Sequence, residues 1–145
     1  MTEPRQRILF ICTGNACRSQ MAEAWTRHLL GDRIEAFSAG TAPHAMDPRA
    51  LAVMRECGVD MSGQRPKPLA DVSDLPFDLV VTVCDHAATA CPVWPGTART
   101  VHHGFDDPPR LARGAKDERE ALQAYRRVRD QIRDFVQMLA AGKAV

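Results

Sequence analysis

The chain has 145 residues, enough for one domain and too few for two. Hydrophobic residues make up 45% of it and charged residues 26%, a balance that excludes a disordered chain. The net charge is +1, from 19 basic and 18 acidic residues, so no strong overall field favours nucleic acid or a membrane surface. Any anion site must therefore be local.

The chain contains no apolar run of signal-peptide or membrane-spanning length, so we expect a cytoplasmic protein and take it to be a monomer. Its five cysteines form an odd set, which argues against a framework of structural disulfides. Metal binding, catalysis and plain packing remain open for them.

The first half of the chain alternates apolar runs of strand length with helical patterns. Ser19 is expected to cap the first helix, Asp47 the second, and Gly58 to end the second. The predicted elements are a strand over 7–11, a helix over 19–30, a strand over 34–38 and a helix over 48–57.

The second half continues the alternation. The predicted elements are a strand over 77–83, a weaker strand over 99–102 and a long helix over 117–140. The charge-rich stretch 110–120 is interpreted as solvated surface. Strands that alternate with helices indicate a single α/β domain over residues 1–145, with a parallel four-stranded sheet flanked by helices on both faces.

Ligands of such sheets bind beyond the carboxyl ends of the strands. There Cys12 begins a loop with the pattern Cys, five residues, Arg18, Ser19, placed between a strand and a helix. A helix N-terminus offers unpaired N–H groups to an anion, and Arg18 offers a planar fork to two of its oxygens. The same field stabilises a thiolate at Cys12, to which Ser19 can hydrogen-bond.

Residues 12–18 are therefore interpreted as an oxyanion site with a nucleophile, here called the anion loop. Gly14 and Asn15 are expected at positive φ, which turns successive N–H groups inward. The alternative is that Cys12 only packs and Arg18 only lies on the surface. The expected oxyanion-binding residues are Thr13, Gly14, Asn15, Ala16, Cys17 and Arg18.

This pattern directly after the first strand resembles the low-molecular-weight protein tyrosine phosphatases and their arsenate-reductase relatives. Those families also carry an Asp-Pro on a later loop, which Asp107 and Pro108 match. The resemblance implies that Asp107, rather than Asp106, is the catalytic acid.

Two further cysteines, Cys84 and Cys91, follow the strand over 77–83, and they resemble the cysteine pair of thioredoxin-coupled arsenate reductases. The resemblance implies that Cys12 attacks arsenate, that Cys84 attacks the sulfur of Cys12 and releases arsenite, and that Cys91 passes the disulfide to thioredoxin. Arsenate is then the substrate, with phosphate or sulfate as analogues, and no cofactor is implied. The other hypothesis is a phosphatase that hydrolyses phosphate monoesters.

Two other interpretations of Cys84 and Cys91 stay open. Cys84 and Cys91 could be incidental, or they could form a zinc site with His86 and with His102 or His103, although the spacing is not that of a known zinc knuckle. We expect no metal site. Cys17 is expected to matter through its backbone, and Cys57 through packing.

Some similar reductases bind potassium beside the anion loop with an Asn, a Glu, a Ser and an Asp. Asn15, Glu23 and Ser38 match the first three, whereas Lys67 stands in place of the Asp. An ammonium there could neutralise Glu23 directly, and the alternative is that Lys67 is simply exposed. Because the chain departs from the pattern of these reductases at Lys67, we expect no dependence on potassium.

Overall fold

A computed structural model describes residues 5–83 and 98–140. Its centre is a parallel four-stranded sheet with the strand order β2-β1-β3-β4. The strands are β1 (Gln6–Cys12), β2 (Ile34–Gly40), β3 (Leu79–Thr82) and β4 (Arg99–His102). All four strands lie where the apolar runs predict them.

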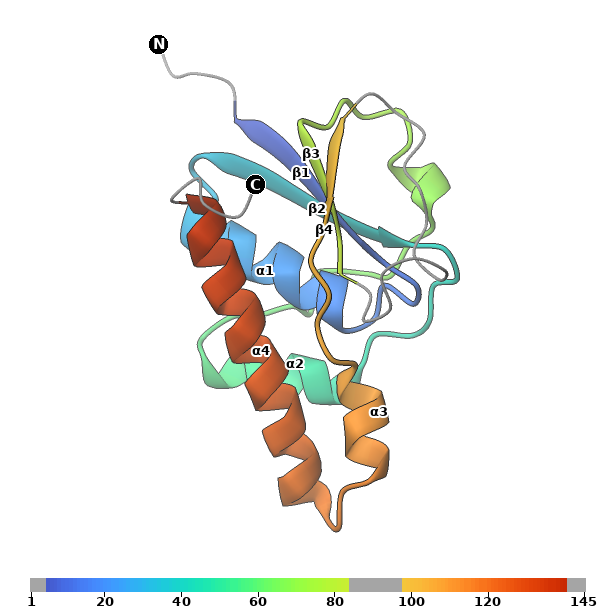
Figure 1. Cartoon of the computed structure of the whole chain (residues 1–145), viewed down its shortest axis with the longest axis vertical. Coiled ribbons are helices and arrows are strands. Elements are labelled where there is room, and N and C mark those ends of the chain that lie inside the picture. The colour runs from blue at the N-terminus through green and yellow to red at the C-terminus, as the bar shows by residue number, and fades with distance from the viewer. Residues whose placement is uncertain (1–4, 84–97, 141–145) are drawn as a thin grey trace.

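Four α-helices and one short 3-10 helix complete the described part of the chain (Figure 1). They are α1 (Arg18–Leu30), α2 (Pro48–Glu56), η1 (Leu69–Asp71), α3 (Pro108–Arg113) and α4 (Glu118–Ala140). No helix in these ranges is long and apolar enough to cross a membrane. The 23-residue α4, for example, buries only one stripe, at steps of three and four that include Val128, Ile132 and Phe135.

The two faces of the sheet carry two cores of unequal size. Ile8 and Phe10 of β1 point into the larger core, which takes residues from all four α-helices. Leu9 and Ile11, one residue out of phase, point into a smaller core with Val72 and the residues around η1. Figure 1 shows α1 and α4 on one side of the sheet and η1 (light green) on the other. The predicted α/β fold with a parallel four-stranded sheet is confirmed.

The strand order explains where a ligand can bind. The chain runs from β1 out to β2 and then crosses to β3 on the other side of β1. This reversal makes the carboxyl ends of β1 and β3 the topological switch point, where open α/β sheets bind their ligands. Cys12 is the last residue of β1, so the anion loop begins at that crevice.

One prediction about a helix is wrong. The first helix begins at Arg18 with Cys17 as N-cap and no side-chain cap, because the Ser19 hydroxyl is bonded elsewhere. Residues 110–120 are mostly exposed, as expected, but α3 extends into them from Pro108 and buries Ala112. Pro108 and Pro109 occupy the first two positions of α3 and hold the backbone there in a helical conformation. In the sequence, the charged residues around them concealed this signal for a helix.

The docking of α4 gives a test of the larger core. Ile132 is fully buried, so Ile132→Ala should lower the free energy of unfolding by about 2–5 kcal/mol. Met138 on the same helix is 45% exposed, and Met138→Ala should change it by less than about 0.5 kcal/mol. Urea denaturation of the two variants measures both values. Equal effects would contradict this packing of α4.

Candidate active site

Every carbonyl of residues 13–17 in the anion loop accepts a hydrogen bond from a group that lies outside it. Three of the donors are backbone N–H groups of the segment that follows β2. The bonds are Ala42 N to Thr13 O (2.9 Å), His44 N to Gly14 O (2.8 Å), Gln20 Nε2 to Asn15 O (2.9 Å), Asp47 N to Ala16 O (3.1 Å) and Met21 N to Cys17 O (2.9 Å).

These bonds orient the N–H groups of the loop. The described peptide bonds are trans, and a trans peptide directs its N–H opposite to its C=O. The N–H groups of residues 14, 15 and 17 therefore point away from the donors of the segment 42–47, and those of residues 16 and 18 point away from the Gln20 and Met21 donors of α1. The loop also ends at the N-terminus of α1, which has no acidic residue in its first turn. Together these features make the inner side of the loop attractive to an anion.

The backbone of the loop departs from expectation at one position. Asn15 has the expected positive φ, at +47°, whereas Gly14 does not. A Cβ at Gly14 would lie 3.0 Å from the ring of His44, a tight contact that a small shift of this exposed side chain would relieve. Gly40 at the end of β2 is under a stronger constraint, since its Cβ would lie 2.5 Å from the Thr13 carbonyl oxygen. The loop thus packs directly against the end of β2.

The Cys12 thiol lies at the end of a short hydrogen-bonded chain. Cys12 Sγ is 2.8 Å from Ser19 Oγ, which also accepts from Asn15 Nδ2 at 2.8 Å. A thiolate has no proton to give, so Ser19 is the donor whenever Cys12 is ionised. The three side chains are buried, and this donation therefore stabilises a thiolate in place.

Arg18 joins the anion loop to the loop that carries the two aspartates. Its Nη1 donates to the Phe105 carbonyl at 2.9 Å, and its Nη2 lies 3.7 Å from Asp107 Oδ1. Asp106 instead points to Arg127 of α4, also at 3.7 Å, and its side chain is 64% exposed. The structure thus brings Cys12, Arg18, Ser19 and Asp107 into one connected site, and leaves Asp106 on its outside.

The remaining cysteines of the described part have other surroundings. Cys17 is buried, and this burial, with a smaller contribution from Asp47, raises the pKa of its thiol well above the usual value. Its side chain therefore stays a neutral thiol at physiological pH. Cys57 caps the C-terminus of α2 and packs at the edge of the larger core.

Cys84, His86 and Cys91 lie outside the described residues. Of the two histidines considered for a zinc site, His102 has Nδ1 2.8 Å from Thr82 Oγ1, and the ring of His103 packs 4.3 Å from that of Phe135. Residues 5–83 and 98–140 contain no group of three or more His, Cys, Asp or Glu side chains that could hold a metal.

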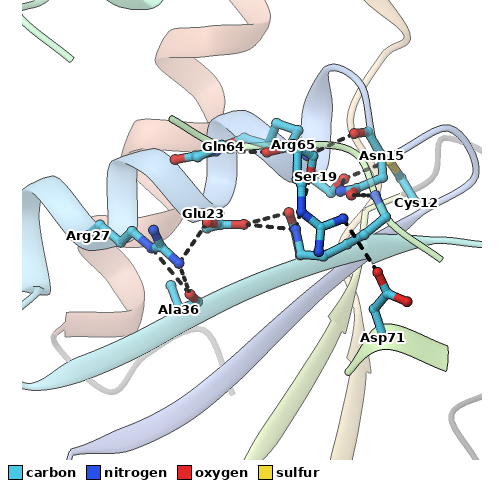
Figure 2. A network of polar contacts seen from close by, with 12 residues as sticks. Cys12, Asn15, Ser19, Glu23, Arg27, Ala36, Gln64, Arg65 and Asp71 are labelled. Carbon is cyan, nitrogen blue, oxygen red and sulfur yellow. Dashed lines mark hydrogen bonds and ion pairs between the residues drawn. The ribbon is translucent and has the colours of Figure 1, made fainter. Parts of the chain in front are cut away.

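A polar stripe continues from the anion loop along α1 (Figure 2). Ser19, Glu23 and Arg27 follow one another at steps of four, so they share one side of α1, and Asn15 in the loop before the helix bonds the first of them. Glu23 is only 2% exposed, and it accepts a hydrogen bond from Ser38 Oγ at 2.6 Å. Its other oxygen lies 2.9 Å from Arg27 Nη2.

Lys67 closes this stripe from the segment before η1. Its N–H donates to Asn15 Oδ1 at 2.9 Å, and its Nζ lies 3.9 Å from Glu23 Oε1. Its side chain is 14% exposed, and this burial lowers the pKa of its ammonium group, against the attraction of Glu23. Lys67 is therefore not a freely exposed residue. Its ammonium group lies beside Glu23, the position that is required if it neutralises this carboxylate in place of a potassium ion.

The family of the chain follows from a comparison with known proteins. The model of the family described as low molecular weight phosphotyrosine protein phosphatase matches residues 7–145. The chain belongs to this family. The resemblance inferred from the sequence is therefore confirmed.

Individual relatives within the family are arsenate reductases. An arsenate reductase of Halalkalibacterium halodurans is 46% identical over 125 residues, which cover 86% of this chain and 88% of the relative. A solved arsenate reductase in the phosphate binding state is 30% identical, with a TM-score of 0.78 over 94% of this chain and 98% of that one. A thioredoxin-dependent arsenate reductase of Corynebacterium glutamicum is 28% identical, with a TM-score of 0.68 over 98% of this chain and 65% of that one.

The position of Lys67 predicts how the protein responds to potassium. We expect the melting temperature to be the same in potassium and sodium salts at equal ionic strength, because no specific ion binds the folded state. Lys67→Asp places a second carboxylate next to Glu23 and should create a preference for potassium. Arg65→Asp makes the same charge change on a side chain that is 71% exposed, and should create none. A potassium preference in the unmodified protein would contradict the role given to Lys67.

Proposed function

We propose that this protein reduces arsenate to arsenite with three thiols, Cys12, Cys84 and Cys91, and that thioredoxin restores them. The observation that carries the proposal is the anion loop, where Cys12 Sγ meets the Ser19 hydroxyl at 2.8 Å beside the N-terminus of α1. The relatives named arsenate reductase support this substrate over a phosphate monoester.

The first step needs an anion site and an ionised nucleophile in one place. Arsenate is a tetrahedral oxyanion, which suits the inward N–H groups of residues 14–18 and the guanidinium of Arg18. The Cys12 thiolate attacks arsenic and forms a sulfur–arsenic bond, while an As–OH group takes up one proton from solvent and leaves as water. Ser19 holds the thiolate by its hydroxyl proton until the attack.

The second step reduces arsenic. The Cys84 thiolate attacks Cys12 sulfur, the sulfur–arsenic bond breaks, and its electron pair stays on arsenic as As(III). Val83 donates its N–H to the Ile11 carbonyl at 2.9 Å, next to Cys12 along β1. Val83, the last described residue before Cys84, therefore lies beside the strand that carries Cys12.

The third step frees Cys12 for another turnover. The Cys91 thiolate attacks Cys84, Cys12 leaves as thiolate, and a Cys84–Cys91 disulfide remains. Thioredoxin then reduces this disulfide by the same exchange chemistry. The thioredoxin-dependent relative of Corynebacterium glutamicum supports thioredoxin as the reductant.

A coupled assay tests the relay. Purified protein with thioredoxin, thioredoxin reductase and NADPH should oxidise NADPH only when arsenate is present. Cys12→Ser should abolish this turnover, because a serine hydroxyl is not ionised at neutral pH. Cys57→Ser, the matched cysteine substitution away from the anion loop, should retain it. Cys91→Ser should release about one arsenite per enzyme and then stop with a Cys12–Cys84 disulfide, because only the last exchange is lost.

Two results would contradict the relay. Arsenate-dependent turnover by Cys12→Ser would show that Cys12 is not the nucleophile. Continued turnover by Cys91→Ser with thioredoxin would show that the third thiol is not required.

The alternative function is the hydrolysis of phosphate monoesters. It uses the same anion loop and also needs an acid that protonates the leaving oxygen. Asp107 is suited to this role by its position 3.7 Å from Arg18, whereas Asp106 points to Arg127. We expect slow hydrolysis of an aryl phosphate as a side activity, with Asp107→Asn lowering its rate about 10²–10⁴-fold and Asp106→Asn leaving it nearly unchanged. The opposite order of effects would assign the acid to Asp106. Fast hydrolysis without arsenate reduction would favour the phosphatase.

A further inference from the structure

Asp47 lies between the anion loop and two helices behind it, and it is bonded on each side. Its N–H donates to the Ala16 carbonyl at 3.1 Å. Its Oδ1 accepts from the Arg49 N–H at 2.9 Å and so caps α2, while its Oδ2 accepts from Tyr125 Oη of α4 at 2.6 Å. We propose that Asp47 is a positioning residue of the anion loop and that Tyr125 holds it in place, so that α4 helps to set the affinity for an oxyanion.

The bond to Ala16 is the link to anion binding. The Ala16 carbonyl and the Cys17 N–H belong to the same peptide group, so fixing one fixes the direction of the other. A shift of Asp47 lets this peptide rotate and turns the Cys17 N–H away from the inner side of the loop. The inference rests on the proposed function, because it assumes that the loop binds oxyanions through these N–H groups.

Tyr125 is suited to hold Asp47 because its own position is fixed. It is 1% exposed, and the guanidinium of Arg49 lies 6.0 Å above its ring. Arg49 is in turn bonded twice to Glu118 at the start of α4, at 3.0 and 2.8 Å. The Tyr125 hydroxyl thus reaches Asp47 from a ring enclosed by the core and by one cation.

The negative charge of Asp47 opposes the binding of an anion, and this makes the positioning role testable. The negative charge of Asp47 lies near a loop that must attract anions, and it contributes to the raised pKa of Cys17. If Asp47 acted mainly through its charge, its removal would strengthen anion binding. If it acts by position, its removal weakens anion binding even though a repelling charge has gone. The sign of the change therefore separates the two roles.

Titration of the full-length protein with inorganic phosphate measures this sign. Asp47→Ala and Tyr125→Phe should each weaken phosphate binding on the order of five- to tenfold, the lower range for coupled sites. Asp47→Asn should bind phosphate at least as well as the unmodified protein, because its amide oxygen still caps α2 and its N–H can meet the Tyr125 hydroxyl. The double variant Asp47→Ala/Tyr125→Phe should bind no more weakly than Asp47→Ala, since Tyr125 acts through Asp47.

A second tie between the same helices provides the control. Arg129 Nη1 of α4 donates to the Val53 carbonyl at 2.9 Å and to Glu56 at 3.0 Å, at the end of α2 remote from Asp47. Arg129→Lys should lower the stability of the fold and leave phosphate binding unchanged. If it weakens phosphate binding as much as Tyr125→Phe, general loosening of α4 explains both, and the inference is overturned.

The remaining outcomes also decide. Tighter phosphate binding by Asp47→Ala, or additive losses in the double variant, would overturn the positioning role while the anion loop stands. Unchanged phosphate binding by Tyr125→Phe would also overturn the positioning role. If the unmodified protein binds no phosphate, the anion loop is itself wrong and this inference fails with it.

Discussion

The outward hydrogen bonds of the anion-loop carbonyls are the constraint on which the site depends. A loop between a strand and a helix has carbonyl and N–H groups in equal number, and an anion is attracted only if the carbonyls face elsewhere. Here the carbonyls of residues 13–17 accept hydrogen bonds from donors in the segment 42–47 and in the first turns of α1. The sheet topology serves the same end, since β2 lies beside β1 and returns the chain to the loop.

The polar stripe behind the loop stabilises a carboxylate inside the protein, that of Glu23. Burial of Glu23 is unfavourable unless its charge is compensated and its oxygens are bonded. Arg27, Lys67 and Ser38 supply this, each from a different element of the fold. Because the Lys67 N–H also holds Asn15, the same segment that compensates Glu23 aligns the chain from Asn15 to Ser19 to Cys12.

Local sequence signals predicted most of the fold and the centre of the site. Apolar runs located all four strands, and periodicity located α1, α2 and α4, because burial on one face leaves a regular pattern. The family resemblance, carried by the Cys12–Arg18 spacing and the Asp107-Pro108 pair, singled out Arg18 and Asp107, which lie 3.7 Å apart. Ser19 misled as a cap because the same hydroxyl can bond a helix N–H or a neighbouring thiol, and only the folded loop decides between them.

What the sequence did not reveal depends on contacts between distant residues. Tyr125 fits its helix as an ordinary core position, and nothing local shows that its hydroxyl reaches Asp47, 78 residues earlier. The donors from Ala42, His44 and Asp47 are backbone groups, which leave no trace in residue type. The short α3 was hidden because charged residues surround its apolar contact at Ala112.

Arg18 has a consequence for how the two loops of the site communicate. Arg18 is the last residue of the anion loop, and its guanidinium bonds the Phe105 carbonyl next to the aspartate pair. An anion that draws this guanidinium inward changes its bond to Phe105, and a change in the aspartate loop changes the guanidinium available to the anion. By thermodynamic linkage the two effects are of equal size. The binding of an anion at the loop and the conformation of the aspartate loop are therefore coupled equilibria.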